Sequence, residues 1–148
     1  MEKLKVYLSL LAFCCLLSAG VAQAQQEMTA KKFENPEWKQ VMLVKFEPES
    51  IERAKEIIRN YFVKADIKAG RQGPSVAVDL VTGEWDMMLV WDMKGGIEDL
   101  NWETSPDDVK WMTAMNDIAG GKDKARALLK EWSSTINRST SYIGRTAK

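Results

Sequence analysis

Both cysteines of this chain lie within its first 15 residues, and the chain contains no histidine. The same N-terminal stretch has the layout of a secretory signal peptide: Lys3 and Lys5, an apolar run over residues 6–17, and an Ala-x-Ala pattern that ends at Ala24. We therefore expect cleavage after Ala24 and a secreted or periplasmic mature protein. An uncleaved anchor is the alternative, but an apolar run of about 12 residues is short for a membrane span.

After cleavage the fold has to be held by apolar packing, because a disulfide framework is excluded. The remainder is long enough for one domain with its own core, and its six Trp and seven of the chain's eight Met supply large apolar side chains. We expect a flexible N-terminal arm over residues 25–37 and one domain over residues 38–148. The 21 basic and 21 acidic residues balance, so no charge excess favours nucleic acid or a membrane surface as a partner.

The missing residue types also exclude classes of chemistry. Without histidine there is no Ser-His-Asp triad, no zinc site of the usual His type and no histidine haem ligand. Without cysteine after cleavage, thiol catalysis and iron–sulfur clusters are excluded. What remains is carboxylate, Lys, Tyr and Arg chemistry, or a hard cation with oxygen ligands. We expect no metal and no cofactor, and the lack of a catalytic set favours a non-catalytic role.

Apolar periodicity and turn signals predict the elements: a strand over 39–46, a helix over 51–64, strands over 75–81 and 84–93 joined by Thr82-Gly83, a helix begun by Ser105-Pro106, a second helix after Gly120-Gly121, and a strand over 138–144. This β-α-β-β-α-α-β order predicts an α+β, ferredoxin-like domain. Its sheet would have four antiparallel strands in the order 4-1-3-2, with the helices on one face.

The element order resembles that of the dimeric α/β-barrel superfamily, which includes small monooxygenases and stress-responsive barrel proteins. The resemblance spans about residues 41–143 and lies in the topology. It implies the fold, and a dimer in which two sheets pack face to face. It carries over no catalytic residue, and the haem-binding branch of that superfamily typically uses a histidine, which this chain lacks.

A two-residue turn at Thr82-Gly83 would place Asp79 opposite Asp86 on neighbouring strands. Like charges in directly opposed positions are unfavourable. Three arrangements would relieve them: an ion pair with Lys45 on the first strand, a divalent cation bridging both carboxylates, or one carboxyl kept protonated as an acid or base. The ion pair with Lys45, or simple solvation at a sheet edge, is the favoured interpretation.

The same counting assigns the faces of the hairpin. Toward the helices it places Val76, Val78 and Leu80 together with the stripe Trp85, Met87, Leu89, Trp91 and Met93. Core packing is the expected role of this stripe, and the floor of an aromatic ligand site is the alternative. The other face is mixed, because Val41, Leu43 and Met88 accompany the acids. A half-apolar face needs a cover, which predicts a homodimer or a bound ligand.

Three functional hypotheses follow. The favoured one is an exported non-catalytic domain that is homodimeric through this sheet face and binds a small apolar ligand or a protein partner, with Lys45, Met88 and Trp102 as ligand-binding candidates. The alternative is a small monooxygenase-like enzyme without a histidine-ligated cofactor, with Asp79, Asp86 and Tyr142 as catalytic candidates. The third is an envelope protein whose exposed strand edge adds to another sheet.

Overall fold

The computed structural model describes residues 28–146, so the expected signal peptide and its cleavage site lie outside the described residues. The chain divides into two compact units, residues 1–33 and 34–148. Of the first unit, residues 28–33 are described, and they contain neither helix nor strand. No helix within residues 28–146 has the length and apolar character that a bilayer span requires.

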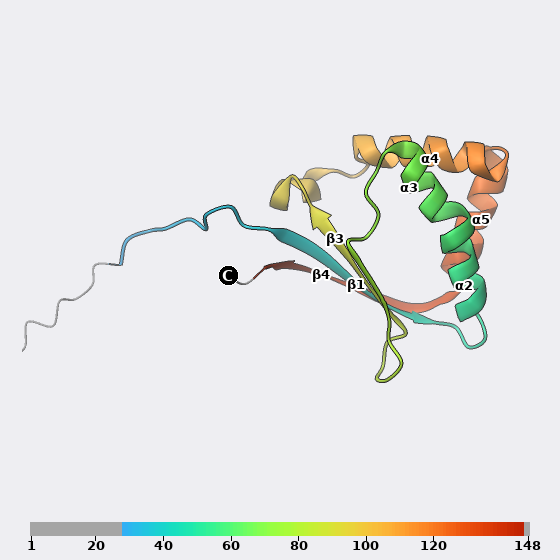
Figure 1. The fold of residues 1–148 in the computed structure, drawn as a ribbon, viewed down its shortest axis with the longest axis horizontal. Coiled ribbons are helices and arrows are strands. Elements are labelled where there is room, and N and C mark those ends of the chain that lie inside the picture. The colour runs from blue at the N-terminus through green and yellow to red at the C-terminus, as the bar shows by residue number, and fades with distance from the viewer. Residues whose placement is uncertain (1–27, 147–148) are drawn as a thin grey trace, which may run out of the picture. The chain divides into compact units, whose positions relative to one another are not determined.

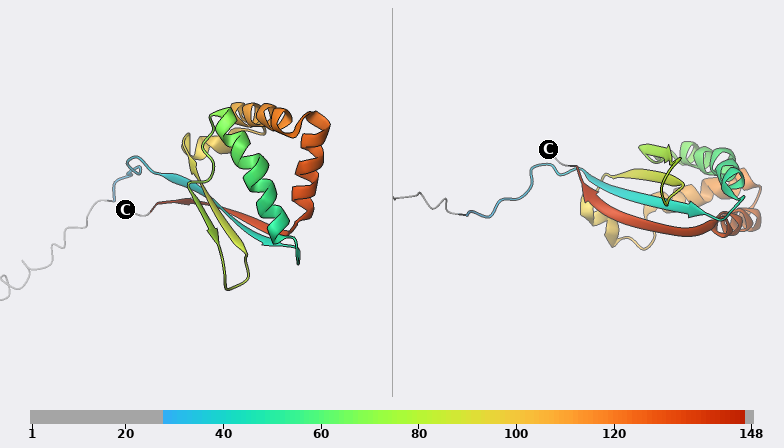
Figure 2. Two further views of the ribbon diagram at one scale, coloured as in Figure 1. Left: turned by 45° about the vertical axis from the view of Figure 1, so that its right-hand side comes forward. Right: turned by 90° about the horizontal axis from the view of Figure 1, so that it is seen from below.

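The second unit contains one antiparallel sheet of four strands. They are β1 (Trp38–Phe46), β2 (Val76–Asp79), β3 (Met87–Met93) and β4 (Ile136–Arg145), in the order β2-β3-β1-β4. This is the predicted order read from the other edge, so the predicted topology is confirmed. The helices lie on one side of the sheet, and the view from below shows the strands in front of them (Figures 1 and 2).

The first helical run joins three segments, α2 (Ile51–Ile57), a π-helical turn η1 (Ile58–Phe62) and α3 (Val63–Ala69). It is five residues longer than the predicted 51–64, and it ends at Gly70, whose φ of 65° is left-handed. A π-helical turn changes which side of a helix faces the core. Residues before it pack against the sheet, whereas Tyr61 and Phe62 pack into a second cluster formed by helices.

The second helical pair follows a short 3-10 segment, η2 (Gly96–Asn101). Helix α4 (Pro106–Ala119) starts with a capping box: the Ser105 hydroxyl accepts the N–H of Asp108 at 3.1 Å, and the Asp108 carboxylate accepts the N–H of Ser105 at 3.0 Å. Helix α5 (Lys122–Ser134) then returns to β4. The predicted helix start at Ser105-Pro106 is confirmed.

The core consists of two buried clusters joined by aromatic rings. The sheet cluster contains Val44, Phe46, Ala54 and Met87, and the helical cluster contains Ala65, Ala114, Met115 and Ala125. Edge-to-face contacts connect them through Phe46–Trp132 (5.9 Å), Phe62–Trp132 (5.4 Å) and Phe62–Trp111 (5.5 Å between ring centroids). Phe62 therefore lies where the sheet cluster and the helical cluster meet.

The predicted register of the hairpin is wrong by one residue. Asp79 lies opposite Met87 and Val78 opposite Met88, because residues 80–86 form a longer loop closed by the Leu80 N–H, which donates to the Asp86 carbonyl at 2.9 Å. Asp79 therefore does not face Asp86. A shift of one residue also exchanges the faces of a strand, so Val76 and Val78 point away from the helices.

The predicted apolar stripe of β3 is confirmed in part. Met87 and Leu89 pack into the sheet cluster. Trp85 precedes the strand and does not join them, since the guanidinium of Arg138 lies over its ring at 4.7 Å. Fewer apolar side chains of the hairpin therefore face the helices than the sequence predicted.

Replacing Phe62 by alanine is expected to lower the free energy of unfolding by about 3 kcal/mol, because the ring contacts aromatic side chains of both clusters and truncation of a packed Phe costs roughly 3–5 kcal/mol. Urea unfolding followed by tryptophan fluorescence measures it. The matched control is Ile67→Ala on α3, which is 75% exposed and is expected to change stability by less than about 0.5 kcal/mol. Equal losses in both variants would contradict the linking role of Phe62.

Candidate functional site

The sheet surface turned away from the helices carries a strip of apolar side chains across all four strands. We call it the outer sheet face, and its apolar members are Val41, Leu43, Val76, Val78, Met88, Val90 and Tyr142. They share one face because directly opposed residues and alternate residues of a strand point the same way. Val76 is 43%, Val78 38% and Tyr142 57% exposed. The register shift makes this face more apolar than the sequence predicted.

Asp86 is held by an ion pair at the end of this strip. Lys45 Nζ donates to Asp86 Oδ1 at 2.8 Å, and the Phe46 N–H donates to Asp86 Oδ2 at 2.9 Å. The hydrogen bond from Lys45, reinforced by that of the Phe46 N–H, lowers the pKa of Asp86. Asp86 is therefore ionised at neutral pH, and the expected pairing with Lys45 is present. The hypothesis that Asp86 stays protonated and acts as an acid is therefore wrong.

The other charges beside the strip are paired in the same way. Lys39 Nζ lies 2.6 Å from Asp92 on the neighbouring strand, and the hydrogen bond from Lys39, followed by that from the Ser75 hydroxyl, lowers the pKa of Asp92. Arg138 pairs with Glu84. Each of these acids thus has a cation beside it, and the apolar strip is bordered by neutralised pairs.

Asp79 lies on the opposite side of the sheet from Asp86. Lys55 of α2 donates to its carboxylate at 2.7 Å, and the Asp79 side chain is 57% exposed. The predicted Asp79–Asp86 site is therefore wrong, both as a bridged cation site and as a shared acid and base. Within residues 28–146 no group of three or more potential metal-binding acids gathers. The third catalytic candidate, Tyr142, lies on the outer sheet face opposite Val41.

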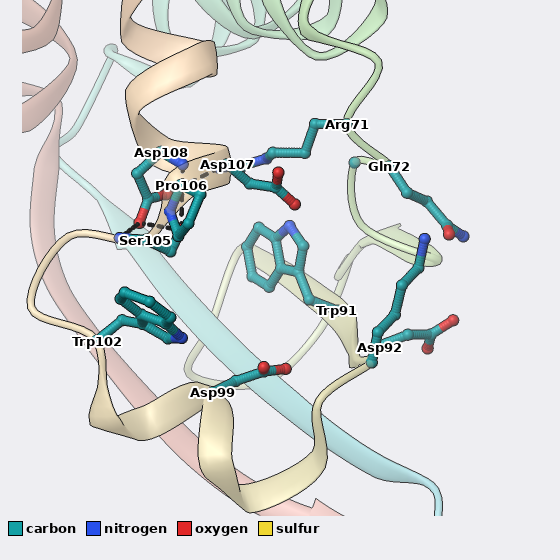
Figure 3. Close-up of a pocket in the computed structure, with 12 residues that line it drawn as sticks. Arg71, Gln72, Trp91, Asp92, Asp99, Trp102, Ser105, Pro106, Asp107 and Asp108 are labelled. Carbon is teal, nitrogen blue, oxygen red and sulfur yellow. Dashed lines mark hydrogen bonds and ion pairs between the residues drawn. The ribbon is translucent and has the colours of Figure 1, made fainter.

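A separate cleft of about 480 Å³ opens on the helix side, where β3, η2 and the start of α4 approach one another (Figure 3). Its lining includes Trp91, Trp102, Asp99, Asp107, Arg71 and Lys94. Trp102 is 58% exposed. Of the three predicted ligand-binding residues, Trp102 lies on this cleft, whereas Lys45 and Met88 lie on the outer sheet face. The structure does not bring the three together.

Arg71 fixes one wall of the cleft. Its guanidinium lies 3.2 Å from Asp66 and 3.1 Å from Asp108, and above the Trp111 ring at 5.6 Å. Burial raises the pKa of Asp66, against the opposing charge of Arg71. Burial would also raise the pKa of Asp108, but hydrogen bonds from Ser105 and the charge of Arg71 lower it overall. These residues join the cleft wall to the helical cluster.

No sequence pattern indicated Arg71 or Asp99 as site residues, and alternation along the strand predicted a core role for Trp91. Asp99 accepts the N–H of Gly95 at 3.1 Å, and a Cβ at Gly95 would overlap the Asp99 carboxylate. The glycine is therefore needed for this close approach. A glycine pair followed by an aspartate four residues later, with Trp102 beyond it, is the signal that could have indicated a built turn here.

The sequence matches no protein-family model and no curated protein. Two crystal structures of NIPSNAP family proteins from Agrobacterium tumefaciens strain C58 are similar in fold. One is 9% identical with a TM-score of 0.50 over 80% of this chain and 93% of its own. The other, described as having unknown function, is 7% identical with a TM-score of 0.50 over 80% and 96%. At these identities the likeness shows the ferredoxin-like α+β fold alone.

Asp86→Asn is expected to lower stability at pH 7 and to match the unmodified protein in strong acid. The pKa of Asp86 is lowered by folding, so its stabilisation is present above the unfolded-state pKa of about 3.9 and is lost as pH falls through the folded-state pKa. Chemical unfolding at a series of pH values measures the difference. Asp79→Asn, which removes an exposed pair, is the control and is expected to have little effect. A penalty for Asp86→Asn that stays constant into strong acid would contradict the ion-pair assignment.

Proposed function

We propose that the chain is an exported, non-catalytic binding domain that forms a homodimer through its outer sheet face. The observation that carries the proposal is the apolar strip, which crosses all four strands and which the helices within residues 34–146 leave uncovered (Figure 2). An antiparallel sheet that faces water ordinarily carries polar residues on its exposed face. Contiguous exposed apolar surface of this kind marks an interaction site.

The charges around the strip favour a second copy as the occupant. The pairs Lys39–Asp92, Lys45–Asp86 and Arg138–Glu84 are closed within one chain. A twofold dimer presents the same surface from both sides, so unpaired like charges would repel each other across it. With the charges already paired, two such faces can meet without that cost. The resemblance in element order to proteins that pack two sheets face to face supports the same arrangement.

The ligand proposed for this dimer is small and apolar. Met88 and Tyr142 stand on the strip at positions where the two sheets would meet, opposite Val78 and Val41 respectively. A flexible thioether adapts to irregular apolar shapes, and a Tyr ring offers an apolar body with one polar end. A ligand held between the two sheets would complete the burial of the apolar strip. Native mass spectrometry of the exported protein distinguishes an empty dimer from a loaded one.

The proposed site of action follows from the N-terminal sequence. Residues 1–24 combine a basic start, an apolar run and an Ala-x-Ala end. Export would also remove Cys14 and Cys15, leaving a protein without thiols. The arm that begins at residue 25 is then the new N-terminus.

Val90→Lys on the outer sheet face is expected to weaken dimerisation at least about 100-fold, because a twofold interface would bury two unpaired ammonium groups. Sedimentation velocity at micromolar concentration measures the change, and circular dichroism checks that the monomer keeps its fold. The control is Ile67→Lys, which adds the same charge to an exposed position on α3 and leaves the dimer intact. An unmodified protein that is monomeric at this concentration would rule out the dimer.

Expression of the full chain in a secreting host is expected to yield exported protein that begins at Gln25 and lacks both cysteines. Intact-mass measurement and thiol titration read this directly. Ala24→Leu is the control, since a large residue at the cleavage position blocks processing. Exported material that retains Cys14 and Cys15 would overturn the cleavage proposal while leaving the dimer proposal untouched.

A further inference from the structure

We propose that the cleft between the end of β3, η2 and the start of α4 binds a small organic cation of the quaternary alkylammonium class. The cleft lies on the helix side of the sheet and shares Asp92, at the end of β3, with the border of the outer sheet face, but its aromatic lining is separate from the apolar strip, so it is a second site. Its volume of about 480 Å³ lies within the roughly 300–1,000 Å³ of small-molecule sites. Its walls come from four segments of the fold, with the loop at residues 71–73 as the fourth (Figure 3).

Two tryptophans supply the aromatic walls. Figure 3 shows Trp91 near the middle of the lining and Trp102 to its left, with the Asp99 carboxylate below both rings in this view. Within residues 28–146, Trp85, Trp111 and Trp132 are engaged in ring or guanidinium contacts, whereas neither Trp91 nor Trp102 has such a contact. Trp102 is 58% exposed and Trp91 is partly buried in the cleft wall, so both indoles contribute surface to the lining. The face of an indole attracts a cation placed within about 6 Å of its centroid.

The charge of the lining selects a cation. Four carboxylates line the cleft against two cationic side chains, namely Asp92, Asp99, Asp107 and Asp108 against Arg71 and Lys94. Arg71 is held by Asp66 and Asp108, and Asp92 is held by Lys39. Asp107 pairs with the exposed Lys110. The charge of Lys94 acts on Asp92 as well. In the described part of the chain Asp99 has no ion pair, and the only hydrogen bond of its side chain is the one from the Gly95 N–H.

Asp99 is also held in a defined position. Its carboxylate packs against Gly95 at the start of η2, where no side chain intervenes, and accepts the backbone N–H there at 3.1 Å. The opposite wall is held by Arg71 and the capping box of α4. A charged group fixed on rigid elements stabilises a ligand without a large ordering cost.

A quaternary ammonium fits this lining better than other ligand classes. Its charge is spread over methyl groups, so it loses little hydration when it sits between indole faces. An anion would be repelled by the excess of carboxylates. A neutral molecule of the same shape would keep the apolar contacts and lose the attraction of Asp99 and the two rings. Comparison of a cation with its neutral isostere therefore decides the ligand class.

Choline and its neutral isostere, 3,3-dimethylbutan-1-ol, are the two probes. Each is titrated into the protein at low ionic strength while the indole N–H resonances of the tryptophans are followed by NMR. We expect saturable shifts of the Trp91 and Trp102 resonances with choline, and at least about tenfold weaker binding of the neutral alcohol. Equal binding of both probes overturns the cation assignment, and absence of saturable binding by choline overturns the site.

Two substitutions locate the site. Trp102→Ala and Asp99→Asn are each expected to weaken choline binding at least about fivefold, and the asparagine keeps an oxygen that can accept the Gly95 N–H. Trp85→Phe, far from the cleft beneath Arg138, is the control and leaves binding unchanged. Urea unfolding checks that the exposed Trp102 can be removed without loss of the fold. Choline binding that survives both cleft substitutions would place the ligand elsewhere and overturn the proposal.

Discussion

A row of four aromatic rings connects the sheet to the helices, and the rest of the structure depends on it. Phe46 contacts Trp132, Trp132 contacts Phe62, and Phe62 contacts Trp111. The helical cluster is made mainly of alanine, with Met115 as its one large buried side chain. Small residues alone bury little apolar area, so the large rings supply the packing between the two clusters. Edge-to-face pairs add about 0.5–1.5 kcal/mol each beyond the area they bury.

The row of rings also reaches the cleft. Arg71 lies over Trp111 and holds Asp108, the residue that closes the capping box of α4. The wall of the cleft is therefore continuous with the core. The outer sheet face has the opposite character, because it is bounded by surface ion pairs and no helix or strand within residues 34–146 covers it. One domain thus presents two different surfaces, a cleft lined by more acidic than basic side chains and an apolar sheet face.

The sequence predicted the strand order and the helix start at Ser105 because both depend on local patterns that act independently. Periodicity identifies a strand, and Ser-Pro followed by acids identifies a helix N-terminus. The hairpin register failed because it depends on the length of one loop. Residues 80–86 close through the Leu80 N–H, and this single added residue moved Asp79 to the other face. A register shift of one residue changes the predicted face of every side chain in the strand.

The site residues were predictable to different degrees. An ion pair of Lys45 with one of the two aspartates was predicted because the strands are neighbours and the charges are opposite, and Lys45 pairs with Asp86. Trp102 stood out because it is an aromatic residue in a polar segment. Trp91 was expected in the core because alternation shows which face a residue occupies, but not where the helix above that face ends. Arg71 and Asp66 are brought together by the turn after α3, and no spacing rule indicates their contact with Asp108.

The π-helical turn η1 has a consequence for how relatives of this chain can differ in length. In an α-helix each residue turns the chain by about 100°, so deletion of one residue within Ile58–Phe62 would rotate everything after it by that angle. Ala65 would then point away from α4, although every strand stayed in place. Insertions in the loop at residues 80–86 are absorbed by solvent-exposed backbone. We therefore expect relatives of this chain to keep the length of the helical run from Ile51 and to vary more in the length of the loop at residues 80–86.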